Sequence, residues 1–567
     1  MKNKLTILFE TLVTLCTTVS CTLEETVIST ATRDTFYRNV AECQAGLNGC
    51  YNPLRSIYAS TAFFQMTEVA TDLMLLNVSS QYNAICNITP TRPGIGVGVW
   101  QYGYQGVMRA NAVYAAVERA VERGGITEEE SWPLLAEAVV LRAFFYYIIT
   151  STFGDTPFYT EEVTEDNRAR IARLPRMSAS DTRNYLIDEL MSWLMPAGRG
   201  GREALKLCRT YDDGTDSRIG AAVGLMLAGK FCMWEKRWDD AIAVYGVLED
   251  IYGHYAGNAA AFAARYPLTD IPFSRKYVDE SILELSNIYE EYGLQTAGGL
   301  ACWCSPQRNS TDIEASEGGE IDEANIQKIS DIYNGIAIPE LGGYARTYTS
   351  IRPTSYYFQN LMRYASPDLR SGEYSNGAGE ARGSSGNLAW RWAGYAAADT
   401  DRNERSVLWF STTGRSGNNR PWLGNKFWCF SMYNTRDFNN YKIFRMAGVL
   451  LNLAEAHLMK GDPETACTYL NITRGRAGLD AIKPAVVGGN DEALLEEIRQ
   501  ECARELFGEY QRKFDLVRWG IWYERTLEYN DGSYLRDNIR PCHRYWPIPA
   551  EQVTYSGGAL DNDEYGE

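Results

Sequence analysis

Small and apolar residues recur at helical spacing in three separated parts of the chain, residues 107–145, 221–250 and 447–479. Each part contains two such runs divided by a polar break. The repeated positions are Val107, Ala110, Asn111 and Tyr114 with Leu134, Ala138, Leu141 and Phe145; Ala221, Leu225, Ala228 and Cys232 with Ala241, Val244, Tyr245 and Leu248; and Ala447, Leu451, Ala454 and Leu458 with Ala466, Tyr469, Leu470 and Thr473. Spacings of three and four residues place these side chains on single helix faces. Small residues where paired helices cross predict three tetratricopeptide-like hairpins.

The hairpins do not follow one another at a fixed period, so the chain is not a simple solenoid. We expect a mostly α fold: one helical scaffold interrupted by long loop insertions, with little β structure. The largest insertion runs from about residue 252 to 437 and contains a β-like run at 281–285. Two further helices are predicted at 41–54, ending at Asn52-Pro53, and at 496–520. Insertions on such a scaffold are where we expect specificity to lie.

The first 20 residues are predicted to form a leader. Lys2 and Lys4 precede an apolar run too short to span a bilayer, and the run ends in small residues, which is typical of a secretory signal. Thr18-Val19-Ser20-Cys21 resembles a bacterial lipobox, so we predict cleavage after residue 20 and lipidation of Cys21. A plain signal peptide cut elsewhere is the alternative. No later segment reaches the length of a membrane span, and we expect a body tethered by a flexible segment at 21–35.

The composition limits the kinds of molecule that this protein is expected to bind. The chain has 55 basic and 72 acidic residues, a net charge of −17, which argues against nucleic acid because phosphate binding needs a basic surface. Hydrophobic residues make up 45% of the chain, enough for a large core. The 13 cysteines show no metal-type CxxC spacing, and we interpret most of them as buried small apolar residues.

Five segments, taken in order, resemble the signature segments of the SusD/RagB family. They are AEAVVLRAFFYYIITSTFGDTPFY (136–159), YKIFRMAGVLLNLAEAHL (441–458), LNITRGRAGL (470–479), RELFGEYQRKFDLVRWG (504–520) and YWPIPAEQV (545–553). The resemblance extends from residue 34 to the end of the chain. Two local departures are QECAREL at 500–506, where the family commonly has a further arginine, and the ending LDNDEYGE.

The resemblance implies a SusD-like fold and a surface-exposed lipoprotein of the outer membrane, anchored through Cys21. It implies that the protein binds oligosaccharides or polysaccharides and passes them to a TonB-dependent SusC-like transporter. We therefore expect a signal peptide at 1–20, a lipidated tether at 21–35, an N-terminal region with helical hairpins at 36–251 and a C-terminal region with ligand-binding loops at 252–567. Capture of peptides or glycopeptides is an alternative function, and a surface glycosidase is a second.

Several arginines lie in or beside apolar helical segments: Arg142, Arg445, Arg474, Arg476 and Arg518. They would clamp an anionic ligand under one interpretation. We favour structural pairing with Glu137, Glu455, Glu505 or Asp515, because a buried guanidinium needs partners.

Catalysis has little support in the sequence. The only histidines are His254, His457 and His543, and no GxSxG, HExxH or phosphate-binding loop motif is present;. The many acidic residues leave a glycosidase pair open. We predict that the protein is not an enzyme and has no cofactor. A structural Ca²⁺ ion at Asp212, Asp213 and Asp216 is an alternative to a solvated turn there.

Aromatic side chains in the insertions are the candidate glycan contacts. A sugar ring packs its C–H groups on an indole or phenol face, while its hydroxyls need polar neighbours. The chain has 37 Tyr against 19 Phe, which favours such amphipathic faces. The candidates are Tyr82, Tyr289, Tyr292, Trp303, Trp390 and Trp392, with Gln307, Asn309 and Arg391 as neighbouring hydrogen-bonding groups.

Overall fold

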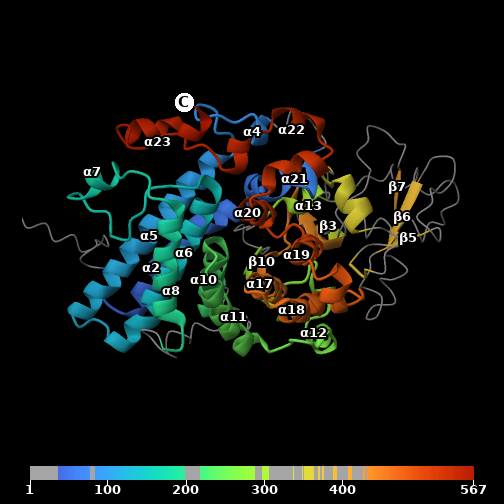
Figure 1. The fold of residues 1–567 in the computed structure, drawn as a ribbon. Helices are drawn as coiled ribbons and strands as arrows, with labels where there is room; N and C mark the ends of the chain where they lie inside the picture. The colour runs from blue at the N-terminus through green and yellow to red at the C-terminus, as the bar shows by residue number, and fades with distance from the viewer. Residues whose placement is uncertain are drawn as a thin grey trace, which may run out of the picture.

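A computed structural model gives the fold (Figure 1). It describes residues 36–76, 83–197, 218–287, 297–304, 336–337, 348, 350–362, 368–370, 373–375, 387–391, 407–411, 425–427, 429, 431–433 and 435–566. Helices dominate the described part, as the sequence predicts, and the strands are short.

The N-terminal helices pack as a bundle on one side of the molecule (Figure 1). The bundle consists of α2 (Val40–Tyr58), α5 (Gly96–Glu122), α6 (Glu128–Phe153), α8 (Ala179–Leu194), α10 (Ala221–Glu235) and α11 (Trp238–Tyr252). The shorter elements of this part of the chain are α3 (Thr61–Phe64), the π-helical turn η1 (Gln65–Val69), α4 (Asn83–Cys86) and α7 (Arg168–Ile171), of which α4 lies apart from the bundle, at the top of Figure 1. The predicted pairs α5–α6 and α10–α11 are confirmed as packed hairpins. Helix α6 is central, and every side chain from Leu134 to Phe153 is buried.

The C-terminal helices continue the packing, and α17 contacts both α10 and α11. They are α12 (Ala259–Arg265), η3 (Leu268–Asp270), α13 (Leu300–Cys304), η5 (Tyr356–Leu361), η7 (Asn425–Phe427), α17 (Met446–Met459), α18 (Pro463–Arg476), η8 (Pro484–Val487), α19 (Asp491–Glu505), α20 (Arg512–Arg518), α21 (Trp522–Tyr529), α22 (Ser533–Asn538), η9 (Pro541–Arg544), α23 (Ala550–Tyr555) and η10 (Asp563–Tyr565). The third predicted hairpin is α17–α18: Asp462 caps α18 by accepting a hydrogen bond from the Thr465 amide at 3.1 Å, and Pro463 begins the helix.

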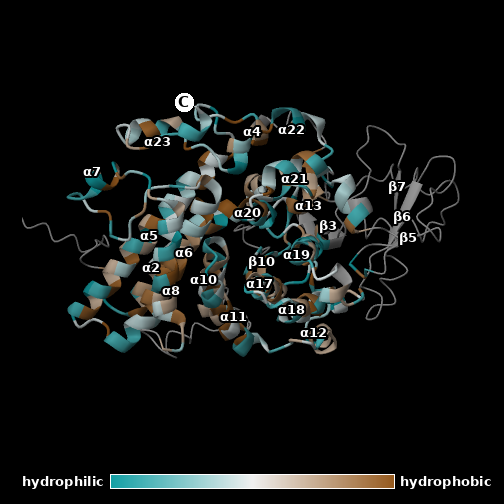
Figure 2. Ribbon diagram, viewed as in Figure 1, coloured by the Kyte–Doolittle hydropathy of each residue, from teal (hydrophilic) through white to brown (hydrophobic). Residues whose placement is uncertain are grey.

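Within the described residues, ten strands form four small sheets. They are β1 (Met74–Leu76) with β4 (Ile351–Pro353); β2 (Ser281–Leu285) with β10 (Tyr441–Arg445); β3 (Ile336–Ala337), β8 (Ser431–Tyr433) and β9 (Arg436–Asp437); and β5 (Glu373–Ser375), β6 (Asn387–Arg391) and β7 (Val407–Ser411). The β-like run at 281–285 is confirmed as β2, and its antiparallel partner β10 leads directly into α17. Hydrophobic residues lie on the inner faces of the packed helices and hydrophilic residues on the outside (Figure 2).

Three local predictions are wrong. The single helix predicted at 496–520 is two helices, α19 and α20, because Gly508 and Tyr510 between them adopt positive φ, which an α-helix does not allow;. Helix α2 does not end at Asn52-Pro53 but continues to Tyr58. Proline removes the N–H that would bond to the Gly49 carbonyl, and Arg109 of α5 donates to that carbonyl instead, at 2.7 Å. In addition, α6 is long and apolar enough to cross a membrane, although no such segment was expected. Its apolar stretch is fully buried inside the protein, as in the core helix of a globular domain.

The arginines of the signature segments are paired with carboxylates, which confirms the structural interpretation. Arg445 contacts Glu280, Glu505 and Glu509; Arg476 contacts Glu280 and Glu505; Arg518 contacts Glu455 and Asp515; and Arg474 lies 3.7 Å from Glu497. Arg142 pairs with Glu189 at 2.5 Å rather than with Glu137, which pairs with Arg218 instead. None of these arginines is therefore left over for an anionic ligand.

Two buried carboxylates tie the beginning of the described chain to its end. Glu68 accepts hydrogen bonds from the backbone amides of Gly508, Gln511 and Arg512, at 3.3, 2.8 and 3.2 Å, and so caps α20. Both carboxylate oxygens of Asp72 accept hydrogen bonds from the Arg512 guanidinium, at 2.6 and 2.8 Å, and one of them also accepts a bond from Arg525 at 2.7 Å. Both carboxylates are fully buried, so the two ends of the chain share one core.

Candidate functional site

Of the six predicted glycan contacts, Trp303 is the one whose side chain the structure describes. Tyr82, Tyr289, Tyr292 and Trp392 lie outside the described residues, as do Gln307, Asn309, Cys21 and the acidic turn Asp212, Asp213 and Asp216. Trp390 and Arg391 lie in β6, where the backbone of Trp390 pairs with Tyr374 on one side and Leu408 on the other. The candidate site is therefore built from Trp303 and its neighbours.

Trp303 lies in a groove of about 710 Å³, in the range of pockets that bind small ligands;. Four separate parts of the chain form its walls. The lining residues are Ala59, Ser60 and Thr61 at the α2–α3 junction; Ala297, Gly298 and Gly299; Cys302 and Trp303 of α13; and Tyr348, Thr435 and Arg436. Thr435 and Arg436 come from the β8–β9 hairpin.

Buried polar contacts fix α13 in place. The Asp437 carboxylate, fully buried, accepts hydrogen bonds from the Ala301 amide at 2.8 Å and from the Tyr441 hydroxyl at 3.2 Å. That hydroxyl also accepts a bond from the Leu300 amide at 3.2 Å. Backbone bonds in both directions join Gly298 to Asp437, at 2.9 and 3.2 Å. The short helix that carries Trp303 is therefore anchored to β9 and β10.

The exposed groups of the groove combine aromatic faces with polar hydrogen-bonding groups. Trp303 is half-buried, and its indole N–H donates to none of the described residues. Tyr348 is 39% exposed, and its backbone amide donates to the Cys302 carbonyl at 2.7 Å. Arg436 is exposed, and three hydroxyl groups line the remaining wall. An indole and a phenol beside a guanidinium and hydroxyls are the groups that a sugar ring requires.

The described lining contains no Asp, Glu or His. A glycosidase uses two carboxyl groups on either side of the scissile bond, and these walls supply neither. Across the described residues there is also no group of three His, Cys, Asp or Glu arranged to bind a metal ion. Ten cysteines are described; all are free thiols and nine are buried, which confirms their interpretation as apolar residues.

Sequence reasoning missed most of this site. Ser60, Tyr348, Thr435 and Arg436 were not among the candidates. Each lies in a stretch without a distinctive pattern, and only the folded chain brings these stretches to Trp303. The one signal that the sequence offered was that Trp303 is an aromatic residue in the long insertion.

Comparisons with known proteins agree with this architecture. Two family models match: that of the SusD family covers residues 411–565, and one described as starch-binding associating with outer membrane covers residues 27–197. SusD-like protein P25 of Formosa agariphila is 23% identical over an alignment of 591 positions that covers 99% of each chain.

Solved structures share the fold. Surface glycan-binding protein A of Bacteroides uniformis gives a TM-score of 0.60 at 20% identity, over 93% of this chain and 99% of that one. Surface glycan-binding protein A of Bacteroides thetaiotaomicron, in complex with laminarihexaose, gives 0.59 at 17% identity, also over 93% and 99%. A SusD superfamily protein of Bacteroides vulgatus gives 0.61 at 17% identity, over 94% and 100%. The chain belongs to the SusD/RagB family.

Proposed function

We propose that this protein binds a glycan in the Trp303 groove, at the surface of the outer membrane. The observation that carries the proposal is the indole of Trp303 beside the phenol of Tyr348, the guanidinium of Arg436 and three hydroxyls in one groove. The names of the two surface glycan-binding proteins with this fold support the same class of ligand.

Binding would proceed by stacking and desolvation. The C–H face of a sugar ring packs on the half-buried Trp303, and its hydroxyls bond to the indole N–H, Arg436, Ser60 or Thr435. Burying an aromatic face against an apolar patch supplies most of the free energy, whereas the hydrogen bonds select the sugar. Because the anchors on Asp437 and Tyr441 fix α13 before a ligand arrives, little ordering entropy is spent on binding.

We extend the proposal to location and delivery. The leader at 1–20 and Cys21 support a lipid-anchored protein, and a description of one matching family refers to the outer membrane. Family membership supports a TonB-dependent SusC-like transporter as the partner. Co-purification of the full-length protein from detergent-solubilised membranes tests this: a transporter of that type is expected in the eluate, and its absence in the presence of the bound glycan would contradict delivery.

We also propose that the protein is not an enzyme, since the described groove walls carry no pair of carboxyl groups. Incubation with a bound glycan should release no reducing sugar. Release that persists through purification and is lost in a groove variant would establish a glycosidase instead.

The binding test is affinity electrophoresis of the purified protein, lacking residues 1–21, in gels containing single polysaccharides. One glycan is expected to retard the protein, and Trp303→Ala is expected to weaken binding by about tenfold or more, as for a buried aromatic anchor. Trp238→Ala on α11, also half-buried but outside the groove, is the matched control and should bind normally. Retardation that survives in W303A would contradict this site. No retardation by any glycan, together with binding of a peptide library, would favour peptides as the cargo.

A further inference from the structure

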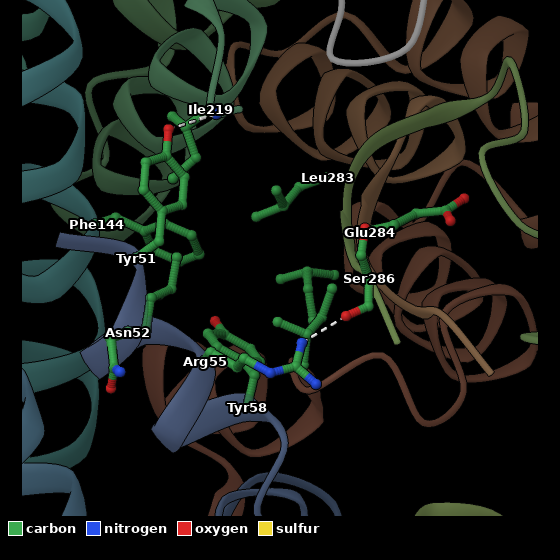
Figure 3. Close-up of a pocket in the computed structure, with 12 residues that line it drawn as sticks. Tyr51, Asn52, Arg55, Tyr58, Phe144, Ile219, Leu283, Glu284 and Ser286 are labelled. Carbon is green, nitrogen blue, oxygen red and sulfur yellow. Dashed lines mark hydrogen bonds between the residues drawn. The ribbon is translucent and has the colours of Figure 1, made fainter. Parts of the chain in front are cut away.

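A second cavity, of about 300 Å³, lies between helix α2, helix α6 and the β2–β10 pair (Figure 3). It shares no lining residue with the Trp303 groove. Most of its wall is apolar, and the lining residues are Tyr51, Asn52, Leu54, Arg55, Tyr58, Phe144, Ile219, Leu283, Glu284, Leu285, Ser286 and Ile443. The buried side chains of Tyr58, Phe144, Leu283 and Ile443 form its floor, while Asn52, Arg55 and Ser286 are more exposed.

Arg55 brings a positive charge to this cavity without a compensating carboxylate. Its guanidinium donates to the Ser286 carbonyl at 2.5 Å and to the Asn287 side-chain oxygen at 2.7 Å, and it forms no ion pair with any described residue. The buried arginines Arg445 and Arg518, in contrast, each contact two or more carboxylates. A partly desolvated cation that bonds only to neutral oxygens favours an anion beside it.

Glu284 does not supply that anion, although it lines the cavity. Its carboxylate accepts bonds from the amides of Tyr277 and Val278, at 2.8 and 3.3 Å, from the Ser281 hydroxyl at 2.6 Å and from the Asn440 side chain at 2.9 Å. Figure 3 shows this side chain directed away from the cavity, while Arg55 lies at its edge.

Tyr58 supplies a second unused polar group. Its side chain is 2% exposed, and its hydroxyl bonds to none of the described residues. Burial raises its pKa well above the usual value, so the hydroxyl is a neutral donor at pH 7. The hydroxyl of Tyr51, on the same helix, differs: it donates to Glu137 at 2.6 Å and accepts from the Ile219 amide at 2.9 Å. The Tyr58 hydroxyl therefore lines the cavity without a bond to a described residue, and it is available there as a donor to a ligand;.

We propose that this cavity binds a small organic acid with an apolar body, as a site separate from that for the glycan. The carboxylate would pair with the guanidinium of Arg55 and accept the Tyr58 hydroxyl. The body would pack on Leu54, Phe144, Leu283 and Ile443. An uncharged sugar suits this site poorly, because its hydroxyls would lie against that apolar wall without partners. The inference does not depend on the proposed glycan function.

The test uses 3-phenylpropanoate as the probe and its uncharged amide, 3-phenylpropanamide, as the matched comparison, with isothermal titration of the purified protein. The acid is expected to bind saturably, with the amide at least about tenfold weaker. Arg55→Gln should weaken binding of the acid at least about tenfold, and Arg55→Lys, which keeps the charge, by less. Tyr58→Phe removes one oxygen without changing the shape of the ring and should weaken binding several-fold.

Two controls separate this site from the groove. Trp303→Ala and Arg436→Gln should bind the acid as the unchanged protein does. No saturable binding of the acid, equal binding of the amide, or full binding by R55Q would each overturn the proposal. Thermal unfolding establishes that each variant is folded, and if R55Q is not, the several-fold loss in Y58F decides the outcome. Failure of glycan binding would leave these results unchanged.

Discussion

The geometry around Gly298 leads to a sharp test of how the groove is built. A Cβ atom added at Gly298 would overlap the hydroxyl and ring of Tyr441. The backbone there cannot move away freely, because bonds in both directions attach it to Asp437. Tyr441 is fully buried and has no space to retreat. Gly298→Ala must therefore displace the segment that leads into α13, or break the contacts of the Tyr441 hydroxyl.

The magnitude follows from those contacts. Displacing Tyr441 removes its hydrogen bonds to Asp437 and to the Leu300 amide, at about 1 kcal/mol each. Overpacking a buried position adds about 1 to 3 kcal/mol, so we expect the free energy of unfolding to fall by about 3 to 5 kcal/mol in all. Because Trp303 moves with α13, glycan affinity should fall by about tenfold or more.

Gly299 provides the matched control. A Cβ atom there would meet only the Thr61 methyl group, at 3.3 Å, a contact that a small shift relieves. Urea denaturation and affinity electrophoresis of G298A and G299A measure both effects. The reasoning would be refuted if G298A kept normal stability and affinity, or if G299A were equally damaged.

Two further predictions concern the scaffold. Burial raises the pKa of Glu68 to about 8, against 4.5 for an ordinary glutamate. Between these two pH values the folded protein keeps a proton on Glu68 that the unfolded chain has released. The resulting contribution to the free energy of unfolding is complete below about pH 4.5 and is lost as the pH rises through 8. Glu68→Gln removes the titrating group, so the midpoint of urea unfolding should fall less steeply with rising pH than in the unchanged protein. An equal pH dependence in the two proteins would contradict the raised pKa of Glu68. Arg109→Met removes the hydrogen bond to the Gly49 carbonyl, which is exposed and can bond to water instead. The substitution should therefore cost about 0.5 to 1 kcal/mol, and less in a Pro53→Ala background, where a backbone N–H at position 53 can bond to that carbonyl. Simple additivity of the two changes in urea denaturation would count against this account.

The helical scaffold could be predicted from the sequence because its signals are local. The spacing of small and apolar residues located the hairpins α5–α6, α10–α11 and α17–α18, and a polar break marked the turn within each pair. The prediction failed where a distant residue compensated a local defect. Pro53 is an ordinary helix breaker until Arg109, on another helix, takes the freed carbonyl. The division of the chain at residue 251 stays a prediction.

It was harder to predict which side chains contact one another across the fold than which side chains are buried. The sequence indicated that Arg142 would pair with a carboxylate, but Glu189, which the crossing of α6 and α8 brings to it, was not among the predicted partners. The groove shows the same limit. Trp303 carried a local signal, but Arg436 becomes its neighbour only through the contacts of α13 with β9, and Tyr348 only through its backbone bond to Cys302. The lipidation of Cys21 stays a prediction.

The capping of α20 by Glu68 and the pairing of Asp72 with Arg512 and Arg525 bear on the order in which the chain can fold. These contacts join residues about 440 positions apart. While the chain is being made or exported, two carboxylates of the early helices have no partners until the last sixty or so residues emerge. The N-terminal helices can collapse before that, but they cannot close their core. A chain cut short before α20 would therefore leave Asp72 without its two arginines and Glu68 without the backbone amides that it caps, and quality-control proteases would meet it in an open state;.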